Sequence, residues 1–274
     1  LAGEAFRITA YYDSVIDNWF NKNDHDFLNR NFTLPMKKIR NLRYGENPHQ
    51  KASLFKYGSD EINQVSGKEI SYNNIVDLDV AINLAHEFDE PSCVIVKHGN
   101  PCGVSIDKKQ KNAFLNALES DPVSAFGGII AFNKALNYET AKEINSIFVE
   151  LVIAPKISKK AKMILAKKKN LILLEYFLNK NERIKHEIRT TKTFLLVQEV
   201  NDRKLKANDL KLVTKGKITN QQIRDMLLGF TICKYINSNA IVLVERNKVL
   251  GIGVGQTNRL DSTIQAIKRG LKKS

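Results

Sequence analysis

The sequence predicts an α/β protein in which helices alternate with short apolar strands. Short runs rich in β-branched residues recur along the chain, and segments with helical spacing of apolar residues lie between them. The tight turn at Arg246-Asn247-Lys248, between two apolar runs, adds at least one antiparallel hairpin. The expected strands are residues 93–96, 129–132, 151–153, 171–174, 194–197, 239–244 and 249–254.

The N-terminal segment is predicted to be a helix followed by a linker. Residues 21–33 are rich in Asn and Asp, which is typical of a polar connection. The first residue, Leu1, already has helical character, so we expect this helix to close a preceding domain. The expected helix covers residues 2–20, and its apolar face is formed by Phe6, Tyr12, Val15, Ile16 and Trp19.

The centre of the first half is a strand that ends at a lysine and a histidine. An asparagine at 73 or 74 is expected to cap a helix running to about residue 88, and the buried strand 93–96 follows it. Pro101 and Gly103 argue against a simple continuation of this strand, so a Pro/Gly-rich loop is expected. Neighbouring strand residues point to opposite faces. Lys97 and His98 can therefore face one ligand only if the backbone has already turned.

The remaining helices are expected between the later strands. A loop over 121–128 precedes strand 129–132, and the interval after residue 174 is rich in lysine and has no clear pattern. Two helix–strand–turn–strand blocks, around 74–132 and 219–254, have a similar order of elements. The expected helices are residues 109–119, 138–148, 158–168, 219–235 and 262–271.

Composition limits the class of protein. With 274 residues, 43% of them hydrophobic, the chain can bury the core of one large domain or two smaller ones. The formal net charge of +14 indicates either solvated lysine-rich faces or attraction for anions. No RNA-binding motif accompanies the charge, so nucleic-acid binding is the less favoured reading. No apolar run approaches the roughly 20 residues that span a bilayer, and no signal peptide is recognisable.

The spacing of the cysteines and of the glycines argues against three features: a disulfide framework, a zinc site and a dinucleotide-binding site. Cys93, Cys102 and Cys233 form neither a disulfide framework nor a zinc pattern, which fits a reducing cytoplasm. The stretch 251–256 is similar to a dinucleotide fingerprint, but its third glycine is out of place and it follows a hairpin turn. We therefore interpret it as a strand whose glycines, which lack side chains, allow a ligand or another part of the backbone to approach closely.

The surroundings of His98 are similar to the zinc deaminase signature, H-x-E with P-C-x-x-C. Here Asn100 stands in place of the glutamate and Ser105 in place of the second cysteine. With these groups missing, no catalytic metal is expected. An imidazole beside a cation is suited instead to proton transfer near neutral pH.

Two further motifs have both a structural and a functional reading. Arg43 and Tyr44 offer a guanidinium fork beside an aromatic face, which suits a nucleotide phosphate and base, although a surface stack would look the same. Phe126-Gly127-Gly128 is either an ordinary turn into a strand or an aromatic wall beside open backbone.

Together these motifs occur in one order that resembles a known family. The resemblance is to the transformylase part of the bifunctional AICAR formyltransferase/IMP cyclohydrolase family, and it covers about residues 34–271. The motifs are Leu42–Gln50, Val94–Gly103, Asp121–Phe132, Val152–Pro155, Ser238–Val242 and Gly251–Arg259.

The resemblance implies a cytidine-deaminase-like three-layer fold, present as two related modules without zinc. Residues 1–33 would be the last helix of the absent cyclohydrolase domain with its linker. Residues 34–190 would form the first transformylase module, and residues 191–274 a second module that lacks its C-terminal part. The family implies a cytoplasmic homodimer with sites at the subunit interface, no nucleic acid and no membrane.

The resemblance also implies a reaction and its residues. The 5-amino group of AICAR (phosphoribosylaminoimidazolecarboxamide) would attack the formyl carbon of the co-substrate 10-formyltetrahydrofolate, in the biosynthesis of IMP. His98 matches the proton-transfer residue and Lys97 the lysine that assists it or stabilises the oxyanion. Positions matching the AICAR site are Arg43, Tyr44, Phe126, Gly127, Glu150, Lys169 and Asn239, and positions matching the folate site are Gln256 and Arg259.

Departures from the family pattern leave an alternative open. The resemblance covers neither the cyclohydrolase domain, apart from its last helix, nor the family's C-terminal segment. Within it, Asn258 stands where Ser is usual, and Thr193-Phe194 replaces a glycine pair. The alternative is a catalytically incomplete remnant that only binds a nucleotide or dimerises. A basic nucleic-acid-binding protein is a more distant one.

Overall fold

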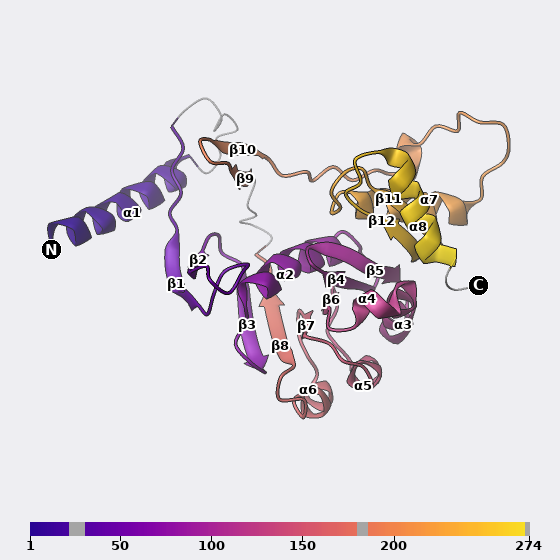
Figure 1. Ribbon diagram of the computed structural model, residues 1–274, viewed down its shortest axis with the longest axis horizontal. Coiled ribbons are helices and arrows are strands. Elements are labelled where there is room, and N and C mark those ends of the chain that lie inside the picture. The colour runs from indigo at the N-terminus through magenta and orange to yellow at the C-terminus, as the bar shows by residue number, and fades with distance from the viewer. Residues whose placement is uncertain (22–30, 180–185, 272–274) are drawn as a thin grey trace. The chain divides into compact units, whose positions relative to one another are not determined.

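The chain divides into two structural units. The computed structural model describes residues 1–21, 31–179 and 186–271. Leu1–Asp60 and Leu178–Asn201 form the first unit, and Glu61–Phe177 and Asp202–Ser274 the second (Figure 1). Most of the predicted linker, residues 22–30, lies outside the described residues. The expected division into two transformylase modules stays a prediction.

The described residues of the first unit form one long helix and two small hairpins. Helix α1 spans Ala2–Phe20, as predicted, and strand β10 contains the predicted strand 194–197 from residue 195 onward. The other three strands were not predicted, because they are short and none of them is a buried apolar run. The two antiparallel hairpins pair β1 (Lys37–Leu42) with β2 (Ala52–Lys56), and β9 (His186–Thr190) with β10 (Leu195–Glu199).

The second unit is built on one mixed sheet of eight strands, in the order β11-β12-β5-β4-β6-β7-β8-β3. The pairs β6–β7 and β7–β8 are parallel, and all other neighbours are antiparallel. The strands are β3 (Glu61–Ser66), β4 (Ser92–Lys97), β5 (Asn100–Ile106), β6 (Ile129–Phe132), β7 (Leu151–Ala154), β8 (Ile172–Phe177), β11 (Ile241–Glu245) and β12 (Lys248–Gly253).

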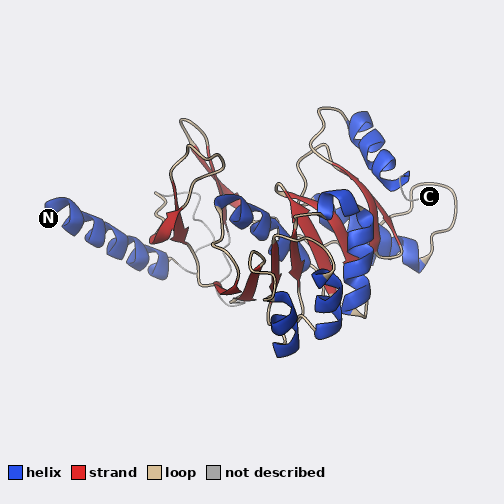
Figure 2. Ribbon diagram, turned by 60° about the horizontal axis from the view of Figure 1, so that its bottom comes forward, coloured by secondary structure: helices blue, strands red, loops and turns tan. Residues whose placement is uncertain are grey.

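Helices cover both faces of this sheet, which confirms the predicted α/β class and fits a three-layer arrangement (Figure 2). The likeness to cytidine deaminases stays a prediction. The helices are α2 (Tyr72–Ala85), α3 (Gln110–Ser120), α4 (Pro122–Ala125), α5 (Tyr138–Asn145), α6 (Lys159–Leu165), α7 (Asn220–Cys233) and α8 (Arg259–Leu271), with a 3₁₀ turn at Ala207–Asp209.

The core explains why the central strands read as continuous apolar runs. In β4, Cys93 and Ile95 belong to the core cluster under α3, α5 and α6. The alternate residues Val94 and Val96 are equally buried but lie outside that cluster, on the face that α2 covers. Both faces of the strand are therefore inaccessible to water, and burying them supplies the main driving force for folding.

The expected Pro/Gly-rich loop after His98 was wrong, because the chain returns as strand β5. Pro101 pairs with Val96 next to a bulge, where the ladder is irregular and a missing N–H is tolerated. Gly103 is needed for packing, since a Cβ there would lie 2.0 Å from the carbonyl oxygen of Ala117 in α3. Pro101 and Gly103, which argued against a strand, therefore both belong to one.

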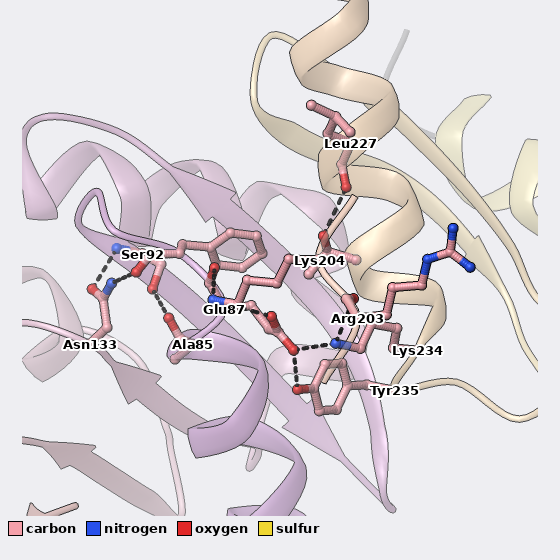
Figure 3. A network of polar contacts seen from close by, with 11 residues as sticks. Ala85, Glu87, Ser92, Asn133, Arg203, Lys204, Leu227, Lys234 and Tyr235 are labelled. Atoms are coloured by element: carbon pink, nitrogen blue, oxygen red, sulfur yellow. Dashed lines mark hydrogen bonds and ion pairs between the residues drawn. The ribbon is translucent and has the colours of Figure 1, made fainter. Parts of the chain in front are cut away.

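A buried polar network joins the loop after α2 to the end of α7 (Figure 3). The Glu87 carboxylate accepts hydrogen bonds from the Lys234 ammonium at 2.6 Å and the Tyr235 hydroxyl at 2.8 Å. The Glu87 and Lys234 side chains are only 10% and 8% exposed. Burial raises the pKa of the Glu87 carboxyl, but the hydrogen bonds from Lys234 and Tyr235 and the nearby charges outweigh burial and lower it overall.

Replacing Glu87 by glutamine is expected to lower the free energy of unfolding by about 2 kcal/mol near neutral pH, since charged hydrogen bonds are lost. Because the folded pKa lies below the ordinary 4.5, this stabilisation is present above pH 4.5 and is lost as the pH falls through the folded value. Urea unfolding of the parent and of Glu87→Gln at pH 7 and pH 3 measures this difference in the free energy of unfolding. A difference between them that does not shrink in acid would contradict the assignment.

No helix among the described residues is long and apolar enough to cross a membrane.

Candidate functional site

The predicted site residues of the second unit lie along one edge of the eight-stranded sheet. Strand β4 ends and β5 begins at this edge, and the pairing of Val96 with Ile129 places the start of β6 there. Because β6, β7 and β8 are parallel, the segments that precede β7 and β8 reach the same edge. The loops that precede these strands carry Phe126, Gly127, Glu150 and Lys169.

The loops of β11 and β12 reach the same edge. Lys248 pairs with Ser105 in antiparallel fashion, so β12 runs toward the Asn100 end of β5. Its last residue, Gly253, pairs with the first residue of β11, Ile241. The segments just outside these two strands carry Asn239, Gln256 and Arg259.

The turn between β4 and β5 consists of His98 and Gly99. Their φ angles are +53° and +70°, and the flanking residues Lys97 and Asn100 pair with one another. Two consecutive residues with positive φ are the mark of a type I′ hairpin turn, which favours Asn, Asp and Gly. Histidine, like Asn and Asp, is enriched among the non-glycine residues that adopt positive φ. The predicted turn that lets Lys97 and His98 serve one ligand is therefore present. The imidazole stands at the tip of the hairpin, and His98 is exposed.

A helix-borne carboxylate holds this turn. Asp77 of α2 accepts the backbone N–H of His98 at 3.2 Å on one oxygen and that of Gly99 on the other. The Asn100 side-chain amide donates to the His98 carbonyl oxygen at 2.9 Å. Asp77 was not predicted from the sequence, because nothing in a helical pattern indicates which acidic residue meets a turn formed 21 residues later.

The ammonium group of Lys97 is directed to the loop before β6. Its Nζ donates to the carbonyl oxygen of Phe126 at 2.7 Å. The Phe126 ring is 61% exposed and lies against the ring of Phe148, with centroids 5.0 Å apart. A fixed cation thus lies next to an open aromatic surface, a combination suited to a planar anionic ligand. Phe148 is a second residue that sequence reasoning missed.

Two glycines, Gly127 and Gly128, lie in the loop beside these rings. Gly127 has a φ of +71°, and a Cβ there would lie 3.3 Å from the Phe148 ring. Its N–H donates to the Phe148 carbonyl oxygen at 3.0 Å, and the Glu150 N–H donates to Gly128 at 3.1 Å. These bonds bring the loops before β6 and β7 together.

Two lysines near these loops have partners that the sequence did not predict. The Glu150 carboxylate forms an ion pair with Lys68 at 2.6 Å, a partner that was not foreseen. Lys169 is exposed in the turn after α6, whereas its neighbour Lys168 donates to the Ile147 carbonyl oxygen at 2.6 Å. Partial burial lowers the pKa of the Lys168 ammonium. Within a run of three lysines, only the tertiary structure distinguishes these positions.

Asn239 ties the loops of β11 and β12 together. Its backbone N–H and its side-chain amide both donate to the Gln256 carbonyl oxygen, at 3.1 and 3.0 Å. Its own carbonyl oxygen accepts the Ser262 hydroxyl at 3.0 Å, near the start of α8. Arg259 is exposed at the first position of that helix. Of the predicted residues, Asn239 and Gln256 are therefore joined by hydrogen bonds, and Arg259 follows Gln256 three residues later in the chain.

Arg43 and Tyr44 belong to the first unit, in the loop between β1 and β2. The Arg43 guanidinium carbon lies 4.9 Å from the centroid of the Tyr44 ring. The arrangement is the predicted fork beside an aromatic face, and Arg43 is exposed.

Among the described residues, no group of three or more His, Cys, Asp or Glu side chains is placed to hold a metal ion. Burial, with a smaller contribution from Asp121, raises the pKa of the Cys102 thiol to about 12, so it is not a nucleophile at neutral pH. The sheet edge offers a cation, an imidazole and aromatic rings, which suit proton transfer on an anionic planar ligand.

The family model and the similar proteins found by comparison point to the same family. The family model described as "AICARFT/IMPCHase bienzyme" matches residues 1–269. A protein of Thermoanaerobacter sp. (strain X514), named bifunctional purine biosynthesis protein PurH, is 44% identical over 279 residues, covering 100% of this chain and 54% of its own length. Proteins of the same name from Caldicellulosiruptor saccharolyticus and Oceanobacillus iheyensis are 42% and 39% identical, covering 98% and 100% of this chain. The chain spans about half the length of these curated relatives.

Proposed function

The chain belongs to the AICARFT/IMPCHase bienzyme family, and we propose that the part present here performs formyl transfer rather than the cyclohydrolase step. The product would be formyl-AICAR, made with 10-formyltetrahydrofolate in purine biosynthesis. The observation that carries the proposal is the β4–β5 hairpin, which places the Lys97 ammonium and the His98 imidazole at the same end of one strand pair.

In the proposed reaction the 5-amino nitrogen of AICAR forms a bond to the formyl carbon, and the bond from that carbon to N10 of the folate breaks. The amine loses one proton and N10 gains one. A histidine can accept the first proton and return it to N10, because imidazole exchanges protons near neutral pH. The Lys97 ammonium, held at the Phe126 carbonyl, would stabilise the oxyanion that forms on the formyl oxygen.

Binding roles follow the chemistry of each group. The Arg43 guanidinium is proposed to bind the AICAR phosphate, with Tyr44 in the same nucleotide pocket. Phe126, Gly127, Glu150, Lys169 and Asn239 are proposed to surround the base, and Gln256 and Arg259 to contact the folate. The net charge of +14 favours approach of two anionic substrates. A cytoplasmic homodimer with shared sites is part of the same proposal.

The test measures both family reactions separately on the purified chain. Release of tetrahydrofolate from AICAR and 10-formyltetrahydrofolate is expected, and conversion of formyl-AICAR to IMP is not. IMP formation without tetrahydrofolate release would reverse the assignment. If neither reaction occurs but calorimetry detects AICAR binding that Arg43→Ala abolishes, the chain is a binding remnant instead.

A further inference from the structure

The same carboxylate-to-turn arrangement occurs twice in the second unit. In the first case Asp77 of α2 accepts the N–H groups of His98 and Gly99. In the second, Asp225 of α7 accepts the N–H of Arg246 at 3.0 Å and that of Asn247 at 2.8 Å. Arg246 and Asn247 have φ angles of +50° and +62°, so this turn is also of type I′.

The two arrangements match along the chain as well as in geometry. Each helix begins with a capping box, and each aspartate lies the same distance into its helix. The intervals between N-cap, aspartate and first turn residue are identical in the two blocks: Ser71, Asp77 and His98 in the first, and Thr219, Asp225 and Arg246 in the second.

The two turns differ in what they carry. The turn held by Asp77 presents His98 at the sheet edge with the candidate site. The turn held by Asp225 lies at the opposite edge, because the Asn247 carbonyl oxygen accepts the N–H of Ile106, the last residue of β5. It presents Arg246, for which the proposed reaction has no role.

We propose that Asp77 is a positioning residue for formyl transfer, which holds the backbone of the His98–Gly99 turn so that the imidazole meets the substrate amine. The inference rests on the proposed function. A positive φ at a residue with a Cβ is costly, and it persists only where the surroundings enforce it. Two N–H groups converging on one carboxylate supply that constraint. Proton transfer depends steeply on distance, so a turn that relaxes should slow the chemical step more than it weakens binding.

The experiment compares Asp77→Asn with Asp225→Asn in the tetrahydrofolate-release assay. Both substitutions replace one acceptor oxygen by an N–H₂ group and loosen an equivalent turn. Asp77→Asn is expected to lower kcat about 10- to 100-fold while the KM values of both substrates change less than about threefold. Asp225→Asn is expected to leave kcat within about twofold of the parent. Asp79→Asn, an exposed position on the same helix as Asp77, is the second control.

Amide hydrogen exchange separates failure of this inference from failure of the proposed function. Exchange at Gly99 should accelerate in Asp77→Asn and not in Asp225→Asn, whether or not the chain is active. An active parent whose Asp77→Asn variant exchanges faster at Gly99 but keeps its kcat would overturn the positioning role. An inactive parent would overturn the proposed function itself. Should Asp77→Asn not fold, Asp77→Glu keeps both acceptors but moves them by one methylene, and an unchanged kcat there would equally count against the role.

Discussion

Replacing His98 by asparagine is expected to lower the rate of formyl transfer by about 10²- to 10⁴-fold, the usual contribution of a general acid–base group. Asparagine is chosen because Asn-Gly is a preferred type I′ turn sequence. The hairpin, the backbone hydrogen bonds that Asp77 accepts and the position of Lys97 should all be retained, so the loss of rate would report on the imidazole. Steady-state tetrahydrofolate release at saturating AICAR and 10-formyltetrahydrofolate measures it.

The matched control for this variant is Arg246→Asn, the same change at the first position of the equivalent turn. It should leave the rate within about twofold of the parent, and urea unfolding should show both variants to be as stable as the parent. His98→Asn activity within tenfold of the parent would refute the assignment of proton transfer to His98. The simpler variant His98→Ala should lose activity to a similar extent, but it also removes a residue type that tolerates positive φ.

Replacing Gly103 by alanine is expected to destabilise the protein by about 3 kcal/mol, at the upper end of the usual cost of overpacking a core. The added Cβ would lie 2.0 Å from the Ala117 carbonyl oxygen, which belongs to the α3 backbone and cannot rotate away. Helix α3 would have to move off β5 and disturb the core around Phe114 and Ile95. Denaturant unfolding followed by circular dichroism measures the change.

Gly270→Ala is the control for this prediction. Its Cβ would make only ordinary contacts, at 3.8 Å from Leu250, and alanine is the better helix former. This variant should be as stable as the parent or slightly more stable. If the free energy of unfolding of Gly103→Ala were lower than that of the parent by less than about 1 kcal/mol, the close approach of α3 to β5 would be wrong.

Much of the second unit could be predicted from the sequence. Central strands such as β4 and β6 are buried on both faces, so their apolar runs are visible in the sequence alone. Helices α2 and α7 were predicted, but the N-cap of α2 is Ser71 and not the expected Asn73 or Asn74. The edge strand β3 was missed because its residues are mostly exposed and polar, and nothing local distinguishes them from a loop. Strand β5 was missed because its proline and glycine serve a bulge and a helix contact that only the assembled sheet creates.

The site divides in a similar way. The sequence alone identified Lys97 and His98 as a pair that needs a turn, because side-chain alternation along a strand is a local property. It also determined the family, through long motifs in a fixed order. Only the tertiary structure decided which residues support that pair. Asp77 reaches the turn from a helix, Phe148 meets Phe126 across two loops, and Lys168 rather than Lys169 reaches the backbone before β7. These contacts join residues far apart in the chain, so they depend on how strands and helices pack and leave no periodic signal in the sequence.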